Sequence, residues 1–323
     1  MSKMIDSNLH VLVLAAGKGT RMRSARAKVL HEVFFAPMIA HVLEAVAALE
    51  PASTTVVVGH QRREVMAALA GRDLEFVIQQ QQHGTAHAVL AAAPELQKRS
   101  GTLLILCGDT PLITPQTLRE MLAAHRRRGD KLSVMTTMVA NPFGYGRIIC
   151  DRAGRLQRIV EEKDATAEER QIREINAGIY GVEIDFLFPA LARVGSDNRQ
   201  GEMYLTDIVE IAGRDGLAAH RYCCADATET LGVNSRVELA QAHAELQMRR
   251  NQELMLAGVT MYRPETIQVA PGVEIGQDTI IHPQVTISGK SRIGAGCTIN
   301  SFNLLHDSEL PAGTEVPPFG NQQ

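Results

Sequence analysis

The sequence predicts an α/β protein in which a mostly parallel sheet is followed by a short parallel β-helix. Two observations support this. Short apolar runs alternate with helical patterns over residues 10 to about 220, and a six-residue repeat replaces them in the tail. Strands separated by helices of this length form βαβ units and hence parallel sheets. At 323 residues, the chain is also longer than one hydrophobic core usually accommodates, so we expect two domains.

The first part of the alternating region contains four expected strands, at Val11–Leu14, Thr54–Val58, Glu75–Ile78 and Leu103–Leu106. Helical patterns lie between them at Ile39–Leu49, Glu64–Leu69 and Ala86–Leu96. The next helix is expected to begin at Thr114-Pro115, where a capping residue precedes a proline in the first helical position.

The second part of this region predicts a smaller, more antiparallel group of strands, at Arg147–Cys150, Leu156–Glu161 and Ile175–Val182. A helix over Tyr204–Ala212 and a strand over Leu217–Tyr222 should follow. Ser235 and Glu238 then form a capping box for a long helix that reaches about Leu256. We interpret residues 235–262 as a linker between the domains.

The tail contains seven apolar residues at a spacing of six: Val269, Ile275, Ile281, Ile287, Ile293, Ile299 and Leu305. This period fits neither a helix nor an ordinary strand. It is typical of a parallel β-helix, in which each hexapeptide forms one side of a coil, and a chance run of β-branched residues is the weaker explanation. Pro311 and Pro317 fall on the next positions of the repeat. Because proline lacks a backbone donor, we expect the stack to end near Leu305.

Composition excludes several classes of protein. The net charge of −3 gives no basic field that would attract nucleic acid or an anionic membrane. No apolar run approaches the ~18 residues that span a bilayer, and the N-terminus lacks the features of a signal peptide. The five cysteines form no C-x-x-C pair, which favours reduced thiols over disulfides or a zinc site. We therefore expect a cytoplasmic protein that binds neither nucleic acid nor membrane.

The segment Leu14–Met22 follows an expected strand and is rich in glycine. It is not a Walker A loop, and Met22 occupies the place of the third glycine in G-x-G-x-x-G. Its glycines still let backbone N–H groups approach an anion, and Lys18 and Arg21 supply positive charge. Lys28 adds a third cation. Such a segment alone is equally compatible with an ordinary tight turn.

Two further segments point to nucleotide chemistry. Asp109 lies just past an expected buried strand, where open α/β sheets bind ligands, and its oxygens suit Mg²⁺ bridging a triphosphate. Asp109 could equally cap the turn before Pro111. The glutamines of Gln79–Gln82 offer donors and acceptors that suit a pyrimidine edge, and the alternative is a short polar tract.

These motifs occur in one order with several others. The glycine-rich segment is followed by Lys28–His31, Gln79–Thr85, Gly108-Asp109, Gly144–Arg147, Val160-Glu161, Lys163–Thr166, Glu174–Asn176 and Gly232–Asn234. Together with the hexapeptide tail, this order resembles the bacterial bifunctional N-acetylglucosamine-1-phosphate uridyltransferase/glucosamine-1-phosphate acetyltransferase family. The resemblance covers essentially the whole chain but only the first part of that family's architecture.

The resemblance implies a Rossmann-like nucleotidyltransferase domain with a mixed sheet over residues 1–234 and a left-handed β-helix over 263–323. It implies nucleotide-binding roles for Leu14, Ala15, Ala16, Gly17, Gln79, Gln82, Gly84 and Thr85. It also implies that Arg21 and Lys28 are catalytic, that Asp109 and Asn234 hold Mg²⁺, and that Gly146, Glu161 and Asn176 bind the sugar phosphate.

The implied reaction transfers UMP from UTP to N-acetylglucosamine 1-phosphate, an amino-sugar 1-phosphate, giving UDP-N-acetylglucosamine and pyrophosphate for cell-wall precursors. The implied assembly is a homotrimer through the β-helix. The family's acetyltransferase positions lie beyond residue 323, so we expect no acetyl transfer. Ala27, Ala177 and Met203 depart from the family's usual residues, and the last two leave the exact amino sugar open. Two alternatives are another sugar 1-phosphate or dTTP as substrate, and a catalytically idle sugar-nucleotide-binding scaffold subunit.

Overall fold

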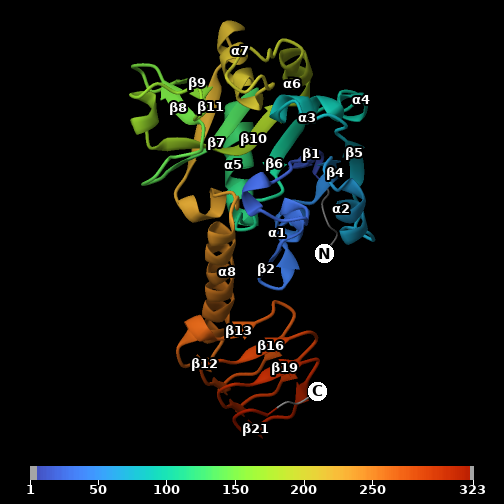
Figure 1. Cartoon of the computed structure of the whole chain (residues 1–323), viewed down its shortest axis with the longest axis vertical. Coiled ribbons are helices and arrows are strands. Elements are labelled where there is room, and N and C mark those ends of the chain that lie inside the picture. The colour runs from blue at the N-terminus through green and yellow to red at the C-terminus, as the bar shows by residue number, and fades with distance from the viewer. Residues whose placement is uncertain (1–5, 321–323) are drawn as a thin grey trace. The chain divides into compact units, whose positions relative to one another are not determined.

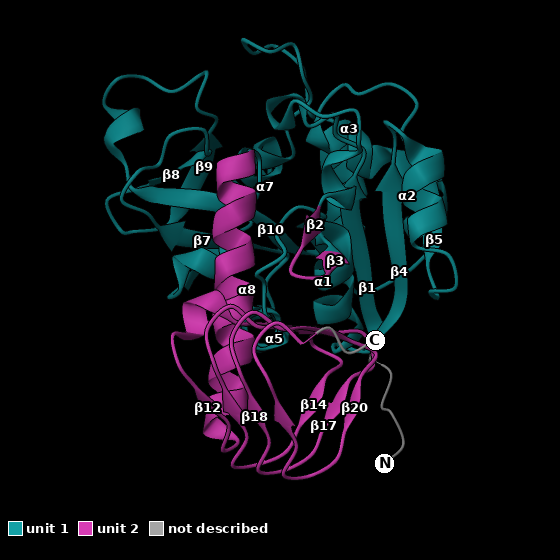
Figure 2. Cartoon of the chain, turned by 60° about the horizontal axis from the view of Figure 1, so that its bottom comes forward, with its two compact units in different colours: residues 1–31, 37–235 teal, residues 32–36, 236–323 magenta. Residues whose placement is uncertain are grey.

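The computed structural model describes residues 6–320 (Figure 1). The chain divides into two compact units, coloured separately in Figure 2. The first unit comprises the chain up to His31 together with Pro37–Ser235. The second comprises Glu32–Ala36 and the chain from Arg236 onward. Among the described residues, no helix is both long and apolar enough to cross a membrane.

The first unit contains a nine-stranded mixed sheet of order β5-β4-β1-β6-β10-β7-β11-β9-β8. Its parallel part consists of β1 (Asp6–Ala15), β4 (Pro51–Val58), β5 (Glu75–Ile78) and β6 (Thr102–Cys107). The remaining strands are β7 (Leu132–Met138), β8 (Arg147–Cys150), β9 (Leu156–Val160), β10 (Glu174–Glu183) and β11 (Ala219–Cys224). Because β10 runs antiparallel to both β6 and β7, the predicted mixed α/β sheet is confirmed.

Helices bury both faces of this sheet (Figure 1). One face packs against α1 (Met38–Ala47), α2 (Arg62–Ala68) and α5 (Pro115–Arg128). The other packs against α3 (Thr85–Ala91), α6 (Ile184–Leu191) and α7 (Ile208–Arg214). Strands buried on both faces carry near-continuous apolar residues, which explains why the runs in β1 and β6 were readable from the sequence.

One expected helix is divided. The pattern over Ala86–Leu96 forms α3 and a separate short helix, α4 (Ala93–Leu96). Pro94 stands at the start of α4. Proline has no backbone N–H and its ring clashes with the carbonyl four residues earlier, so a continuous helix cannot pass through it without a kink.

The second unit begins with α8 (Arg236–Leu256), whose Gln247 and Asn251 side chains donate to the Ile267 carbonyl oxygen at 2.8 and 2.9 Å. Three short parallel sheets follow. They are β12-β15-β18-β21 (Thr260–Met261, Ile280–Ile281, Thr298–Ile299, Glu315–Val316), β13-β16-β19 (Gln268–Val269, Thr286–Ser288, Leu304–His306) and β14-β17-β20 (Glu274–Ile275, Arg292–Ile293, Glu309–Leu310). Most residues of the six-residue repeat are buried in one core.

The expectation that this stack ends near Leu305 is wrong. Leu310 pairs with Ile293 and Val316 pairs with Ile299, and both added residues are buried. The segment between Leu305 and Leu310 is one residue shorter than the corresponding segment of the previous coil, and Asp307 within it adopts a left-handed φ of 49°. The shorter corner brings Leu310 and Val316 into the inward positions and moves each proline to the residue after.

The second unit also contains a turn that the sequence did not predict. Phe34 and Phe35 join β2 (Glu32–Val33) to β3 (Ala36–Pro37) with φ of 43° and 67°, a costly conformation for bulky residues. The Phe34 N–H donates to His243 Nδ1 at 3.1 Å, and the two rings meet edge to face. Phe35 packs against the core of this unit. Ring packing holds the strained turn in place.

Candidate active site

A cavity of about 900 Å³ opens at the carboxyl ends of the parallel strands. This edge is where open α/β sheets bind their ligands. The cavity is lined by Leu14–Arg21, Lys28, Val29, Gly59, His60, Gln79–Gln82, Gly84, Thr85, Ala88, Cys107, Asp109, Glu202 and Asn234. The structure therefore brings together every residue predicted to bind nucleotide or metal, and both predicted catalytic cations.

The glycine-rich loop is shaped by close packing against the Lys28 segment. Gly19 has a left-handed φ of 58° and precedes the short 3₁₀ turn Thr20–Met22. A Cβ atom at Gly19 would lie 2.5 Å from the Lys28 Cβ. Both the backbone angle and the contact require glycine at this position. Gly17, in contrast, has open space where a side chain would stand.

Lys28 lies between the two residues predicted to hold a metal. Its ammonium forms an ion pair with Asp109 Oδ2 and donates to Asn234 Oδ1 at 2.6 Å. Asp109 follows β6, and its backbone oxygen accepts from the Val233 N–H at 2.8 Å, which holds the Asn234 segment beside it. Two hard oxygen atoms, far apart in the sequence, thus converge on one cation.

The glutamine loop is fixed at both ends. Gln79 is buried, and its amide nitrogen contacts the Gly84 oxygen at 3.3 Å and His87 Nδ1 at 3.0 Å. Gln82 donates through its side-chain amide to the Ala16 backbone oxygen, which joins this loop to the glycine-rich one. Gly84 has φ 106°, and a Cβ there would lie 2.4 Å from the Met203 oxygen.

The three predicted sugar-phosphate residues form their own cluster and do not line this cavity. A Cβ at Gly146 would lie 3.5 Å from Glu161 Oε1 and 3.6 Å from the Asn176 Cβ. The Asn176 N–H donates to the Gly146 oxygen at 2.9 Å. Asn176 also uses its side chain locally, donating to the Tyr180 hydroxyl at 2.8 Å and accepting from the Gly178 N–H at 3.0 Å.

Glu161 is the carboxylate of this cluster. Burial raises its pKa, and the nearby charges of Asp207 and Asp164 act in the same direction. The Thr206 hydroxyl donates to Glu161 Oε1 at 3.2 Å and partly opposes that rise. Glu161 is thus a partly desolvated acceptor, which suits a site that binds hydroxyl groups.

Several residues at the cavity were missed by sequence reasoning. His87 contacts Gln79, while His60, Cys107 and Glu202 line the wall. Burial raises the pKa of the Cys107 thiol to about 12, which makes it an unreactive wall residue. His87 lies in α3, only eight residues after Gln79. The position of Glu202, in contrast, depends on pairing between distant segments, for which the sequence carries no local signal. The Met203 N–H donating to the His83 oxygen at 2.8 Å is an example.

The mixed sheet, the glycine-rich loop and the convergent cations define the class of nucleotidyltransferases, and residues 11–174 match the MobA-like NTP transferase domain. The chain is 48% identical to the bifunctional protein GlmU of Desulfotalea psychrophila over 97% of this chain and 93% of that protein. It is 49% identical to GlmU of Geobacter metallireducens over 94% of this chain and 64% of that protein. The chain belongs to the GlmU family. It is a sugar-1-phosphate uridylyltransferase, as the sequence predicted.

A solved structure supports the fold. A Bacillus anthracis protein assigned as a glucose-1-phosphate thymidylyltransferase, crystallised with sucrose, superposes with a TM-score of 0.59 at 18% identity. The match covers 73% of this chain and 94% of that one. At this identity the likeness concerns the Rossmann-like nucleotidyltransferase fold alone.

Proposed function

We propose that this chain transfers UMP from UTP to N-acetylglucosamine 1-phosphate, giving UDP-N-acetylglucosamine and pyrophosphate. The observation that carries the proposal is the convergence of Arg21, Lys28, Asp109 and Asn234 with the loop Gln79–Thr85 around one cavity. An idle binding subunit does not need this set of charges.

The proposed reaction is a direct displacement. A phosphate oxygen of the sugar 1-phosphate forms a bond to the α-phosphorus of UTP, and the bond from that phosphorus to the pyrophosphate oxygen breaks. The attacking phosphate is already ionised, so no general base is required. The protein contributes orientation and positive charge where the transition state develops negative charge. We assign the latter role to Arg21 and Lys28.

The nucleotide is proposed to contact the two loops that Gln82 and Ala16 join. We assign Leu14–Gly17, together with Gln79, Gln82, Gly84 and Thr85, to holding the uridine. Amide side chains carry both donors and acceptors, as the edge of uracil requires.

We propose that Asp109 and Asn234 hold Mg²⁺. Their oxygens converge on a single cation, the Lys28 ammonium, and both are hard ligands of the kind that Mg²⁺ prefers. Among the described residues there is no cluster of three His, Cys, Asp or Glu side chains that could hold a metal alone. Mg²⁺ in nucleotide sites is usually held by one or two protein oxygens, with phosphates and water as its other ligands, and two protein oxygens fit that pattern. When bound, the ion would supply further neutralisation of phosphate charge.

We further infer that Gly146, Glu161 and Asn176 bind the sugar phosphate. We also infer that the stacked sheets form a short left-handed β-helix, that the chain assembles as a homotrimer through it, and that the protein is cytoplasmic. Residues 1–234, 235–262 and 263–323 are proposed as catalytic domain, linker helix and β-helix. Light scattering tests the assembly, since a monomeric mass would contradict the trimer.

A substrate matrix tests the reaction. Pyrophosphate release should be measured with UTP or dTTP against N-acetylglucosamine 1-phosphate, glucosamine 1-phosphate and glucose 1-phosphate, each with and without Mg²⁺. We expect turnover to be fastest with UTP, N-acetylglucosamine 1-phosphate and Mg²⁺ together. A faster reaction with another pair would reassign the substrate, and no turnover with any pair would favour a binding subunit.

A further inference from the structure

We propose that Arg147 and Glu162 are positioning residues for the sugar-phosphate acceptor, because the ion pair between the buried Arg147 and the partly exposed Glu162 fixes Gly146 against Glu161. Neither residue belongs to the set proposed above to touch the substrate. The inference rests on the proposed function, since it concerns the acceptor side of the same reaction.

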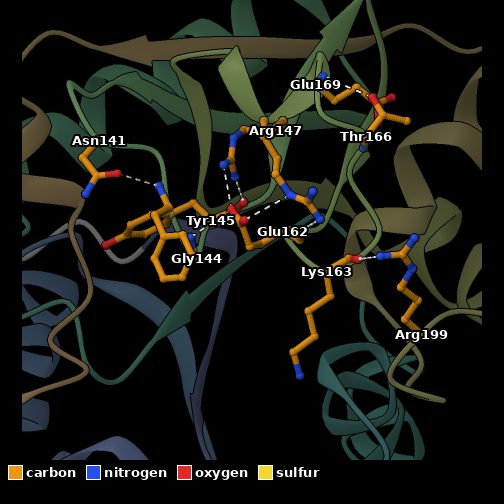
Figure 3. A network of polar contacts seen from close by, with 11 residues as sticks. Asn141, Gly144, Tyr145, Arg147, Glu162, Lys163, Thr166, Glu169 and Arg199 are labelled. Atoms are coloured by element: carbon orange, nitrogen blue, oxygen red, sulfur yellow. Dashed lines mark hydrogen bonds and ion pairs between the residues drawn. The ribbon is translucent and has the colours of Figure 1, made fainter.

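The pair joins two segments of the sugar-phosphate cluster (Figure 3). Arg147 begins β8 and is only 1% exposed. Its guanidinium donates to Glu162 Oε2 at 2.6 Å and to the Tyr145 backbone oxygen. The Gly144 N–H donates to the same Glu162 oxygen at 3.1 Å. The Glu162 carboxylate thus accepts hydrogen bonds from both ends of the turn Gly144–Arg147, and Gly146 lies inside that turn.

Burying the charged Arg147 guanidinium is costly, so its surroundings are narrowly determined. A buried guanidinium is tolerated only when its charge is paired. The Nε of Arg147 is buried without a hydrogen-bond partner, so the bond to Glu162 is the charge pairing on which the guanidinium depends. The turn has few alternatives, because Gly144 has a left-handed φ of 86° and Arg147 is in register with Val160 and Ile175 on the neighbouring strands. A change at Glu162 therefore acts first on the turn.

The spacing at Gly146 leaves little room for such a change. A Cβ there would lie 2.8 Å from the Ile159 side chain and 3.5 Å from Glu161 Oε1. Because Glu161 and Glu162 are adjacent in the chain, the ion pair couples the turn directly to the carboxylate proposed to bind the sugar. The hydrogen bond from the Asn176 N–H to the Gly146 oxygen also connects Asn176, the third member of the cluster, to this turn.

The two adjacent carboxylates have opposite surroundings. Desolvation opposes ionisation of Glu162, but the bonds from Arg147 and Gly144 and the charges of Arg147 and Arg170 outweigh it and lower its pKa. Arg170 lies 3.4 Å from Glu162 Oε1. No arginine is bonded to Glu161 among the described contacts, and burial raises its pKa. The Glu162 carboxylate is therefore engaged in holding the turn Gly144–Arg147, whereas the Glu161 carboxylate stays available to accept hydrogen bonds from the sugar.

A matched pair of variants tests this role, Glu162→Gln and Glu169→Gln. Glu169 is also ion-paired, to Arg158 at 2.6 Å, and accepts from the Thr166 N–H at 2.8 Å, but its described hydrogen bonds and ion pairs include none to the turn Gly144–Arg147. Steady-state kinetics should be measured for UTP and for N-acetylglucosamine 1-phosphate, with the unfolding temperature of each variant.

We expect Glu162→Gln to raise KM for the sugar phosphate about tenfold while kcat and KM for UTP change less than about threefold, since positioning affects binding of one substrate. Glu169→Gln should leave both KM values near wild type. Arg147→Lys, which keeps the charge but loses the planar fork, should shift KM in the same direction as Glu162→Gln and serves if that variant does not fold.

An unchanged KM for the sugar phosphate in Glu162→Gln overturns the proposal. So does an equal rise in both KM values, or the same shift in Glu169→Gln, because either result indicates a merely structural pair. Wild-type protein without turnover on the sugar phosphate contradicts the proposed function instead, and the two failures are thereby distinguished.

Discussion

The two units differ in the sequence separation and the chemical type of the residues that they bring into contact. In the first, the groups that meet at the cavity come from distant parts of the chain: Lys28 contacts Asn234, 206 residues away. In the second, each position meets its own repeat, so that Ile287 pairs with Val269 on one side and Leu305 on the other. Contacts between distant segments bring side chains of different chemistry together in the first unit, whereas the repeat places apolar side chains on apolar side chains in the second. The difference explains why the proposed site lies wholly in the first unit.

The largest expected effect is a loss of catalytic rate in the first unit, caused by a substitution outside its strands. Arg21→Ala should lower kcat by roughly 10²–10³, about 3–4 kcal/mol, as expected for a lost donor to transition-state charge. Single-turnover kinetics at saturating substrate measure this directly. Arg26→Ala, which removes a nearby exposed cation that is not among the residues lining the cavity, is the matched control. Activity of Arg21→Ala within a few-fold of wild type means that the phosphates lie elsewhere.

The next prediction concerns the repeat. Ile287 is fully buried, and Ile287→Ala should cost about 2–5 kcal/mol of stability, because a methyl-lined cavity opens in the stack. Hydrogen exchange of the backbone at residues 268–316 reports the loss. Thr286→Ala, one residue earlier on the less buried side of the same strand, should change exchange far less. Equal effects of the two variants would show that the stack is not a packed core.

A smaller effect is expected at the proposed metal ligands. Asp109→Asn should raise the Mg²⁺ concentration needed for half-maximal activity about tenfold, because an amide binds the ion more weakly than a carboxylate. KM for the sugar phosphate should change less than about twofold. A Mg²⁺ titration of initial rates checks both. If sugar affinity falls more than Mg²⁺ affinity, Asp109 does not serve the metal.

The smallest effect concerns pH and Asp207. Burial, followed by the charges of Glu210 and Asp164, raises its pKa from 3.8 to about 6. Between those values the folded protein binds more protons than the unfolded chain, so this group's contribution to stability falls as pH rises. Asp207→Asn should therefore raise the unfolding temperature by about 2–4 °C at pH 7.5 and by less at pH 4.5. Asp185→Asn, at an exposed carboxylate, is the control. An equal shift at both pH values would contradict the desolvation of Asp207.

Sequence reasoning located the strands and most of the cavity because both depend on local patterns. Apolar runs marked β1 and β6, and residues just beyond them, such as Gly17 and Asp109, fell at the expected edge. It did not find the contacts that complete the site. Arg147 was recognised within a motif, yet its partner Glu162 is 15 residues away and carries no pattern of its own. The Phe34–Phe35 turn was missed for a related reason, since its φ angles are held by packing against residues that no local rule connects to it.

The short corner after Leu305 has a consequence for how this family can vary. Strands stacked as coils stay in register through their inward side chains, so a corner can lose a residue and the next apolar side chain still reaches the core. We therefore expect insertions and deletions at corners to be tolerated as long as the strands between them keep their length. A search for strict six-residue periodicity would overlook such coils and undercount the repeats in related proteins.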